Sequence, residues 1–588
     1  MGKEAYTLPV GRAGVIFLLA AIFFTVCVID PSIWNGAVTG KYFYFALVIL
    51  LAIVIRSFCK SGKIIRLADV AALLFVVYVL INDCLLNNHP DMHWRLFILM
   101  IPLYVFIRNI SSDRMLVQWG FDIILAVTLI ESCWGLLQLY GFTHSYHTVY
   151  PITGSLFNPG PYSGFLAAGF PIALTNSLDK EVTGWRKWLG IITLIAVLLV
   201  LPVTMSRAAW LAAIAGSVLV LWKYGRKYLK GNILVSGKWK KMLGIMTPLA
   251  GILFMVALYL LKKDSADGRW LIWRICAGMI TGNPLMGVGY GRFAPAFGDA
   301  QAGFFMSGSG SQAQKMIADS SEYAFNEWIQ ITVELGLTGL LLFVCLLLGC
   351  FLFRDRQEQE NRYIRPALLS VLAFATFSYP FSVLPLSVIF VFLLSVAASA
   401  SATLKINIPV WVSRTGVIAC LAVTFYGSYQ TLSRYRAYRK WETLQVQYRL
   451  GIQGGLSDGY RLLYDQLNDQ KEYLFEYAQC LSKAGHYEDS NHILTEFLNY
   501  GCDPMVYNCM GNNYKAMKEY QDAESAYMRA LQVLPNRHYP LYLLMNLYQE
   551  TGQMEKAANM AREILDKLVK VESEAIREMK DEARKLVP

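Results

Sequence analysis

The residues with the clearest capacity for chemistry lie in and just after one long polar stretch, 262–322, which interrupts a series of apolar segments. Arg269 and Arg274 lie near its start, in the sequence GRWLIWR, and Glu327 begins the apolar segment that follows. Charged groups at the mouth of a helical membrane bundle are costly, so we expect them to have a function. A guanidinium there suits an anionic group that arrives from the lipid phase, and a buried carboxylate can act as a base.

Arg207 is a further cationic residue at the start of an apolar segment, directly after Ser206. Burying an arginine at the centre of a bilayer costs about 2.5–3.5 kcal/mol, so we expect it to have a partner. The alternative is a side chain that extends to the membrane interface. Glu131 and Glu334 lie inside apolar segments, and the same cost predicts either a function or a structural pairing for each.

The composition predicts a membrane protein with a smaller soluble part. Hydrophobic residues make up 55% of the 588 residues and charged residues 16%, whereas a soluble domain carries about 25% charged residues. The net charge of +11 does not indicate nucleic-acid binding, because the basic residues lie between apolar segments, where membrane topology explains them. The eleven cysteines are scattered without metal-ligand spacing, so we expect neither a metal nor another cofactor.

About 20 apolar residues cross a bilayer, and on that basis the sequence predicts about thirteen transmembrane helices. The first follows a short basic segment without a cleavage site, so we expect it to be retained with the N-terminus in the cytoplasm. The predicted spans are 13–30, 41–56, 68–87, 94–109, 117–141, 154–177, 187–205, 207–223, 243–262, 323–353, 366–380, 383–403 and 408–428.

The basic residues give these spans an orientation. The connections that thirteen spans place in the cytoplasm are richer in Lys and Arg than the opposite ones, as the positive-inside rule requires. The long loop at 262–322 and the C-terminal tail then face the outer side, although one missed span would move the tail. The histidines before the tail fall on the outer side too: His89, His93, His144 and His147.

The tail, residues 431–588, loses the apolar segments and contains helical repeats. Small and aromatic residues in 510–535 have the spacing of a tetratricopeptide repeat, and part of the pattern returns 34 residues later. An imperfect earlier copy lies at 477–498, and residues 431–470 are expected to form an irregular hairpin that caps the stack. Such α-solenoids commonly bind a protein or peptide, and the alternative is that the repeats only brace the bundle.

Four segments in order resemble the O-antigen ligase and polymerase superfamily of bacteria, which includes O-linked oligosaccharyltransferases. The resemblance covers roughly 65–405 and implies a glycan transferase on the periplasmic side of the cytoplasmic (inner) membrane. The donor it implies is a glycan on undecaprenyl diphosphate, and the acceptor a lipid A core sugar, a glycan repeat or a protein hydroxyl. The segments are GSLFNPGPYSGFLA (Gly154–Ala167), MSRAAWLA (Met205–Ala212), GRWLIWRICAGMITGNPLMGVGYGRF (Gly268–Phe293) and AFNEWIQITVELGLTGL (Ala324–Leu340).

The resemblance assigns roles to the arginines. Its Ser-Arg position is Arg207 and its Gly-Arg position is Arg269, so both are expected to bind the diphosphate. Arg274 is a weaker candidate, because on a helix it points about 140° away from Arg269, and it could instead be a cation in an interfacial aromatic belt. The glycines of 287–291 resemble a phosphate-cradling loop, or they are turns that let the backbone pass close to the donor.

The chain departs from the family at Phe325, where many members have a histidine that is the usual candidate base. Glu327 is our preferred replacement, since a buried carboxylate can accept a proton. The other replacements are Asp319 or Glu322 before the span, or His144 or His147 from an earlier loop. Three further residues are expected to contact substrate: Asn326, Asn158 and Tyr162. Asn158 begins the NPGP segment and Tyr162 follows it, so both could equally belong to a helix break.

The sequence thus predicts an all-α protein with a polytopic transmembrane glycan-transferase domain at 1–430 and a tetratricopeptide-repeat tail at 431–588. Ligation, repeat polymerisation and protein O-glycosylation remain open as outcomes. A non-catalytic scaffold that binds lipid-linked glycan, and recruits a protein through its repeats, is an alternative of a different class. A transporter is less well supported, because paired internal repeats are absent among the spans.

Overall fold

A computed structural model describes residues 11–57, 65–86, 91–232, 263–351, 358–404, 410–452, 455–569 and 572–587. Within these ranges the protein is all-α, as predicted, apart from two-residue strands β1 (Ile65–Arg66) and β2 (Thr403–Leu404), which pair antiparallel. Four described helices are long and apolar enough to cross a membrane, and three shorter ones are also apolar. The chain is therefore a multi-pass membrane protein, and thirteen remains a predicted number of crossings.

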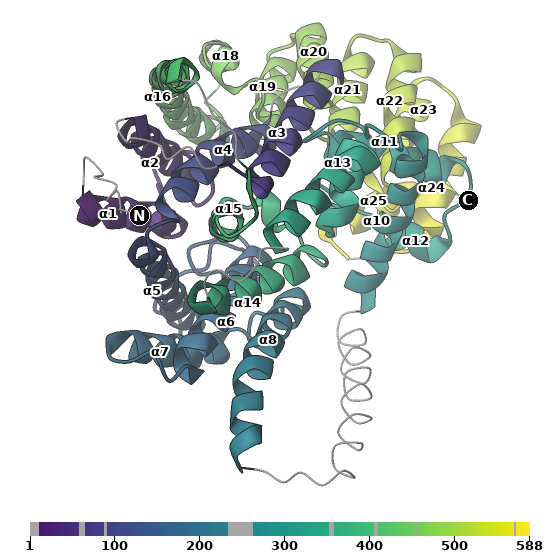
Figure 1. Cartoon of the computed structure of the whole chain (residues 1–588). Helices are drawn as coiled ribbons and strands as arrows, with labels where there is room; N and C mark the ends of the chain where they lie inside the picture. The colour runs from purple at the N-terminus through teal and green to yellow at the C-terminus, as the bar shows by residue number, and fades with distance from the viewer. Residues whose placement is uncertain are drawn as a thin grey trace.

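Twelve of the thirteen predicted spans fall on described helices, and the span predicted at 243–262 lies outside the described residues. These helices form the bundle in Figure 1. They are α1 (Gly11–Phe24), α2 (Thr39–Ser57), α3 (Leu67–Leu86), α4 (Met92–Ile110), α5 (Arg114–Leu139), α6 (Pro159–Leu178), α7 (Trp185–Val200), α8 (Arg207–Asn232), α13 (Glu327–Phe351), α14 (Glu358–Ala375), α15 (Leu384–Ala398) and α16 (Val410–Arg449).

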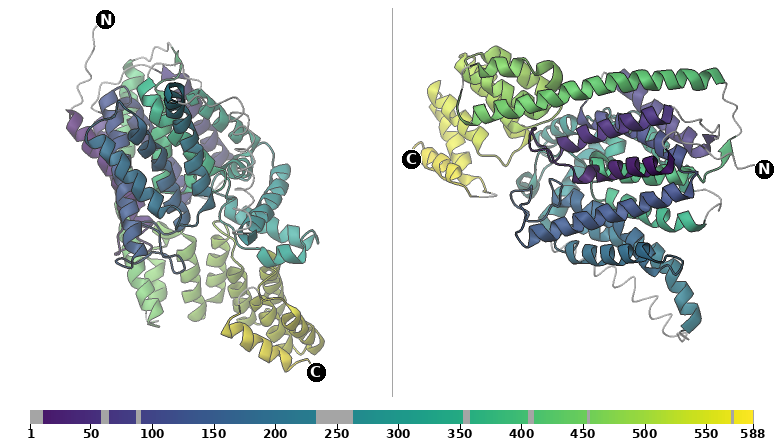
Figure 2. Two further views of the ribbon diagram at one scale, coloured as in Figure 1. Left: turned by 90° about the horizontal axis from the view of Figure 1, so that it is seen from below. Right: turned by 90° about the vertical axis from the view of Figure 1, so that its left-hand side faces the viewer.

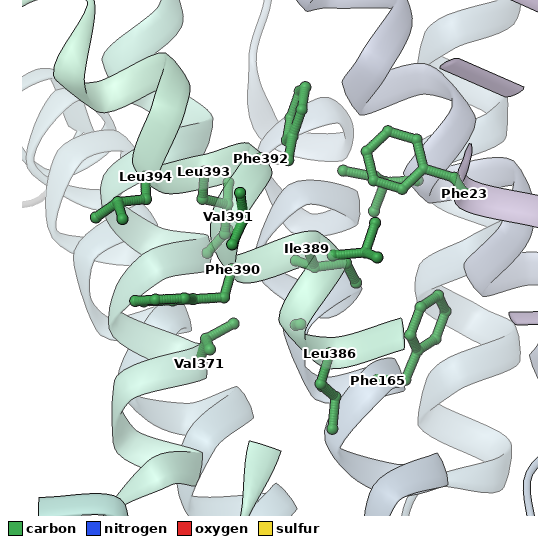
Figure 3. Packing of buried hydrophobic residues seen from close by; sticks show 14 of the residues in the cluster. Phe23, Phe165, Val371, Leu386, Ile389, Phe390, Val391, Phe392, Leu393 and Leu394 are labelled. Carbon is green, nitrogen blue, oxygen red and sulfur yellow. The ribbon is translucent and has the colours of Figure 1, made fainter. Parts of the chain in front are cut away.

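Helix α15 is the centre of the bundle. Every residue from Leu384 to Ala398 is buried, which fits a helix that is apolar on all sides. Its side chains point outward to several neighbours (Figure 3), and Phe392 packs edge-on against Phe23 of α1 and Phe121 of α5 at 5.2 and 5.4 Å between ring centroids. The connections before and after α15 are thereby fixed relative to most of the bundle.

The long loop folds into three helices beside the bundle: α10 (Lys263–Gly282), α11 (Phe293–Met306) and α12 (Gln312–Ile317). Figure 1 shows them next to the helices of the tail, and α11 packs directly on α22. The loop and the tail thus lie together at one end of the bundle, and the side of the membrane that they face stays a prediction.

The tail begins inside one long helix and continues as paired helices. Helix α16 has 40 residues, about 60 Å at 1.5 Å per residue, so the predicted domain boundary at 430 lies within it. Figure 2 shows α16 running along the bundle and into the tail. The tail helices are α17 (Leu456–Arg461), α18 (Tyr464–Leu467), α19 (Lys471–Lys483), α20 (Tyr487–Phe497), α21 (Pro504–Ala516), α22 (Tyr520–Val533), α23 (Tyr539–Glu550), α24 (Met554–Asp566) and α25 (Glu574–Arg584).

Asp469 joins the tail to the bundle. Its buried carboxylate accepts from Arg95 of α4 at 2.9 and 2.6 Å, and from Arg434 of α16 at 2.5 Å. Burial alone would raise the pKa of this carboxyl, but Arg434 and Arg95 outweigh that effect and hold the pKa below its usual value. The docked tail therefore stabilises the ionised form of Asp469 relative to the protonated form.

We expect the docking of the tail to depend on pH and on Asp469. Because the folded-state pKa is lowered, the stabilisation is present above the unfolded pKa of about 3.9 and is lost as pH falls through the folded value. Asp469→Asn should cost about 2–3 kcal/mol at neutral pH, less than a fully buried pair, since Arg95 is partly solvated. Hydrogen exchange of α17–α19 should rise in the variant at pH 7 and in the wild type below about pH 4. Unchanged exchange in both would contradict this account.

Candidate functional site

Arg269 lies where α10 meets the connection between α14 and α15. Its Nη1 donates to the carbonyl of Phe377 at 2.8 Å, and its guanidinium carbon lies 5.2 Å from the ring centroid of Phe325. The ring face is electron-rich, so it favours the cation in this position. Arg269 is thus oriented by two segments that are distant in sequence, one before α13 and one before α15.

Arg207 lies at the first position of α8 and places a second positive charge near Arg269. Burial lowers the pKa of the Arg269 guanidinium to about 10, and the charge of Arg207 lowers it further, whereas Tyr379 opposes the shift. The two arginines that the sequence selected are therefore close enough to repel each other. We call them the arginine pair.

Three aromatic residues pack together next to Arg269. Tyr323 and Tyr379 stack with nearly parallel rings at 4.1 Å, and Phe325 meets Tyr379 edge-on at 5.5 Å. Phe325 has φ of 51°, in the left-handed region that bulky residues rarely adopt. Strained backbone of this kind is often found at functional sites. We call Tyr323, Phe325 and Tyr379 the aromatic cluster.

Glu327, the preferred base in the sequence analysis, holds the same connection that Arg269 holds. Its Oε1 accepts from the backbone N–H of Phe381 at 2.7 Å, and the residue is 4% exposed. Trp328 adds a bond from its indole N–H to the Oγ1 of Thr376 at 3.2 Å. The turn between α14 and α15 is therefore fixed at both ends, by Arg269 on one carbonyl and by Glu327 on one amide.

Helix α13 is broken at Gly336, whose φ of 67° interrupts the helical backbone. The glycine-rich segment after α10 fills this break: Val288 donates to the carbonyl of Val333 and Gly289 to that of Glu334, both at 2.9 Å. A Cβ on Gly287 would lie 2.5 Å from the carbonyl oxygen of Glu334. These glycines therefore let two backbones meet, and the two amides are occupied. The alternative of turns that let backbones pass closely fits this segment better than a phosphate-cradling loop, because the amide of Gly289 is already bonded.

Asn158 and Tyr162, expected to contact sugar, belong instead to the start of α6. Asn158 Oδ1 caps the helix by accepting from the N–H of Gly160 at 2.8 Å. Tyr162 is fully buried and donates to the carbonyl of Glu131 at 2.8 Å. The alternative that the NPGP segment shapes a helix start accounts for both residues.

Glu131 has the structural pairing that was one of its two predicted explanations. Its carboxylate accepts from the backbone N–H of Ser155 at 3.0 Å and from the Ser155 hydroxyl at 2.6 Å. The buried ammonium of Lys41 donates to the carbonyls of Val26 and Val28 at 2.5 and 2.8 Å and contributes an opposite charge. This network fixes the segment that leads into α6.

The remaining candidates in the long loop are engaged by the loop itself or by the tail. The guanidinium carbon of Arg274 lies 5.1 Å from the ring centroid of Phe304 in α11, away from the arginine pair. Asn326 caps α13 by accepting from the N–H of Ile329 at 3.1 Å. The ion-pair partners of the two acids lie in the tail, Arg537 for Asp319 at 3.7 Å and Lys471 for Glu322.

The two histidines of the early loop are engaged there. His147 Nδ1 accepts from the N–H groups of Val149 and Tyr150 at 3.0 and 3.3 Å. His144 is exposed, and its carbonyl accepts from Gln138 at 3.0 Å. These contacts shape the loop, and the alternative that His144 or His147 replaces the family histidine stays a prediction.

The structure adds His93 and Asp91 to the site, neither of which the sequence analysis selected. His93 Nδ1 lies 2.8 Å from Asp91 Oδ2, and its ring meets Tyr323 edge-on at 5.9 Å. The available signal was a histidine on the outer side at the beginning of a span, beside an acidic residue. The sequence could not show that Tyr323 would contact the His93 ring.

A pocket of about 340 Å³ lies between the long loop and the tail, and part of its lining directly precedes the aromatic cluster in the sequence. Ser320, Ser321 and Glu322 line one side, directly before Tyr323, and Glu472 and Phe475 of α19 line the other. Burial raises the pKa of the Glu472 carboxyl, while the ammonium of Lys471 opposes that effect. The tail therefore supplies one wall of a polar recess beside the site.

The family model described as O-antigen ligase matches residues 192–344. The match contains Arg207, Arg269, Glu327 and both sides of the α13 break, and it confirms the resemblance noted from the sequence motifs. No curated protein sequence matches the chain.

The break in α13 predicts opposite effects for two glycines of one region. Gly287→Ala should destabilise the protein by about 2 kcal/mol or more, because φ of 71° is unfavourable with a Cβ and the backbone of Glu334 leaves no space. Gly278→Ala in α10 has open space and should be neutral or stabilising by about 0.5–1 kcal/mol. Thermal unfolding in detergent would compare them. Equal stability of the two variants would contradict the proposed packing of the break.

Proposed function

We propose that the chain, which carries an O-antigen ligase domain, transfers a glycan from undecaprenyl diphosphate to an acceptor hydroxyl. The domain supports a glycan-transferring ligase or polymerase of this superfamily. The donor, the inner membrane as its location and the periplasmic side for the long loop and the tail are part of the proposal. The positive-inside pattern supports that orientation.

The arginine pair is the observation that carries the proposal. A buried guanidinium that is disfavoured by a second positive charge nearby is stabilised when an anion binds next to it. Guanidinium groups also match the oxygens of a phosphate in bidentate geometry. As the donor reacts, negative charge grows on the leaving diphosphate, and donors that are already in place stabilise it most effectively.

The reaction that fits the site is one displacement. The acceptor oxygen forms a bond to the anomeric carbon, while the bond from that carbon to the diphosphate oxygen breaks. The electron pair leaves with undecaprenyl diphosphate, and the acceptor proton passes to a base. Inversion at the anomeric carbon follows from this single step. Glu327 remains a member of the proposed site, through its bond to the turn whose Phe377 carbonyl orients Arg269.

The acceptor is proposed as a class, a hydroxyl on lipid A core, on a glycan repeat or on a protein. The pocket between the long loop and the tail supports an approach from that side, because its serines and carboxylates can hydrogen-bond hydroxyl groups. A repeat tail commonly recruits a protein, which keeps a protein acceptor or partner within the proposal.

Two arginines of α10 provide the test. Arg269→Ala should lower transfer by about 10²–10³-fold, the usual effect of removing one donor that stabilises developing charge. Arg274→Ala should lower it by less than about threefold, since Arg274 packs on Phe304 outside the proposed site. Purified protein would receive undecaprenyl-diphosphate-linked glycan and each acceptor class in turn, with mass spectrometry of the released undecaprenyl diphosphate and of the acceptor.

The result also decides between the enzyme and the scaffold. Transfer that Arg269→Ala abolishes, with mass added to one acceptor, would establish the enzyme and its subclass. Donor that binds the wild type and is never consumed with any acceptor would instead favour the scaffold. Equal loss in both variants would show that the arginines of α10 act through stability, and the assigned role of Arg269 would fail.

A further inference from the structure

We propose that His93 is the base that accepts the proton of the acceptor hydroxyl, and that Asp91 holds it in position. This inference rests on the proposed function, because it names the proton acceptor of that displacement. His93 is the second residue of α4, and Asp91 is the N-cap of the same helix. The two residues are called the His93–Asp91 dyad below.

The orientation of His93 follows from the two oxygens of Asp91. Oδ1 accepts from the N–H of Trp94 at 2.9 Å, which ties the carboxylate to the first turn of α4. Oδ2 lies 2.8 Å from His93 Nδ1. An ionised carboxylate can only accept, so Nδ1 carries a proton, and loss of the proton on Nε2 leaves the lone pair there to face an acceptor. That is the tautomer a general base needs, in the arrangement that a carboxylate gives to a catalytic histidine.

The dyad and Arg269 contact different members of one aromatic cluster. His93 meets Tyr323 at 5.9 Å, Tyr323 stacks on Tyr379, and Phe325 carries Arg269 on its face at 5.2 Å. An in-line displacement needs the base and the leaving group on opposite sides of the anomeric carbon. A base beside Tyr323 and a diphosphate beside Phe325 would occupy different positions along the cluster, as such a displacement needs.

The side chain of His93 is more exposed than those of the two buried carboxylates nearby. Its side chain is 31% exposed, so an acceptor can reach it. Glu327 is 4% exposed with Oε1 bonded to Phe381, and Glu334 is 5% exposed in the α13 break, within 3.4 Å of Gln330. A base must come within hydrogen-bond distance of the proton that it removes.

The other candidates are committed to partners outside the site. Glu322 pairs with Lys471 and Asp319 with Arg537, both in the tail. His147 directs Nδ1 to the backbone of its own loop. His93 thus combines partial exposure with a direct ring contact to the aromatic cluster.

The proton balance of the step is complete. His93 Nε2 takes the acceptor proton while the acceptor oxygen bonds to the anomeric carbon. The imidazolium that forms is stabilised by Asp91, and the diphosphate leaves with the electron pair of the broken bond. Water removes the proton from His93 before the next turnover. No oxidant, metal or covalent glycosyl intermediate is required.

The test compares His93→Gln with His492→Gln, a control on the exposed face of α20. Single-turnover transfer and donor affinity would be measured with undecaprenyl-diphosphate-linked glycan and the acceptor that the wild type uses. His93→Gln should lower the transfer rate by about 10²–10³-fold, the contribution typical of a general base, with donor affinity within about twofold. His492→Gln should retain both. Transfer above about one third of the wild-type rate in His93→Gln would overturn the inference.

A pH profile separates a base from a merely structural residue. The wild-type rate should fall on the acidic side as His93 becomes protonated, and this limb should be absent from the residual rate of His93→Gln. The acids that face His93 are Asp91, Glu322, Glu327 and Glu334, and their own titration would persist in that variant. A limb that persists unchanged would assign it to those acids and overturn the inference.

Asp91→Asn keeps the test decisive if His93→Gln does not fold. It should lower transfer by about 10-fold or more, with donor affinity retained, since the ring would lose the partner that fixes its tautomer. Retained transfer would overturn the inference.

Failure of the proposed function is distinguishable, because then the wild type would not transfer and Arg269→Ala would have no effect. An active wild type that needs Arg269, but neither His93 nor Asp91, would defeat only this inference.

Discussion

The bundle depends on one constraint: wherever a helix breaks inside it, another segment must satisfy the backbone groups that the break frees, since lipid offers no hydrogen bonds. At the break in α13, Val288 and Gly289 donate to the freed carbonyls, and Tyr78 donates to that of Leu335 at 2.7 Å. Ahead of α6, Glu131 binds Ser155. Between α14 and α15, Arg269 and Glu327 bind the turn. Irregular backbone is thus confined to places where polar side chains converge.

The candidate site is assembled from two of these breaks. Arg269 stabilises the fold through the bond from its Nη1 to the carbonyl of Phe377. The proposed chemistry uses its other N–H groups, which take no part in that bond. Helix α15 is buried along its whole length, so the turn that precedes it cannot shift without disturbing the core. A guanidinium held in this way pays little reorganisation when charge develops on a leaving group, which is the condition for strong electrostatic stabilisation.

Local patterns in the sequence predicted the helices and the arginine pair. Apolar segments of membrane-spanning length located twelve helices, and the Ser-Arg and Gly-Arg motifs selected Arg207 and Arg269. The sequence could not predict the roles of residues whose contacts come from distant segments. Tyr162 looked available for sugar, but packing places its hydroxyl on the carbonyl of Glu131. His93 looked ordinary, because Tyr323 joins it only when the long loop folds over α4.

The tail is connected to the site through α4. Arg95, which binds Asp469 of the tail, lies in the same helical turn as His93, and Asp91 accepts from the N–H of Trp94 between them. Lys471, close to Asp469 in the tail, pairs with Glu322 immediately before Tyr323. Both sides of the His93–Tyr323 contact are thus tied to one short segment of the tail. The tail therefore supports the proposed proton acceptor from two directions, through α4 and through the residue before Tyr323.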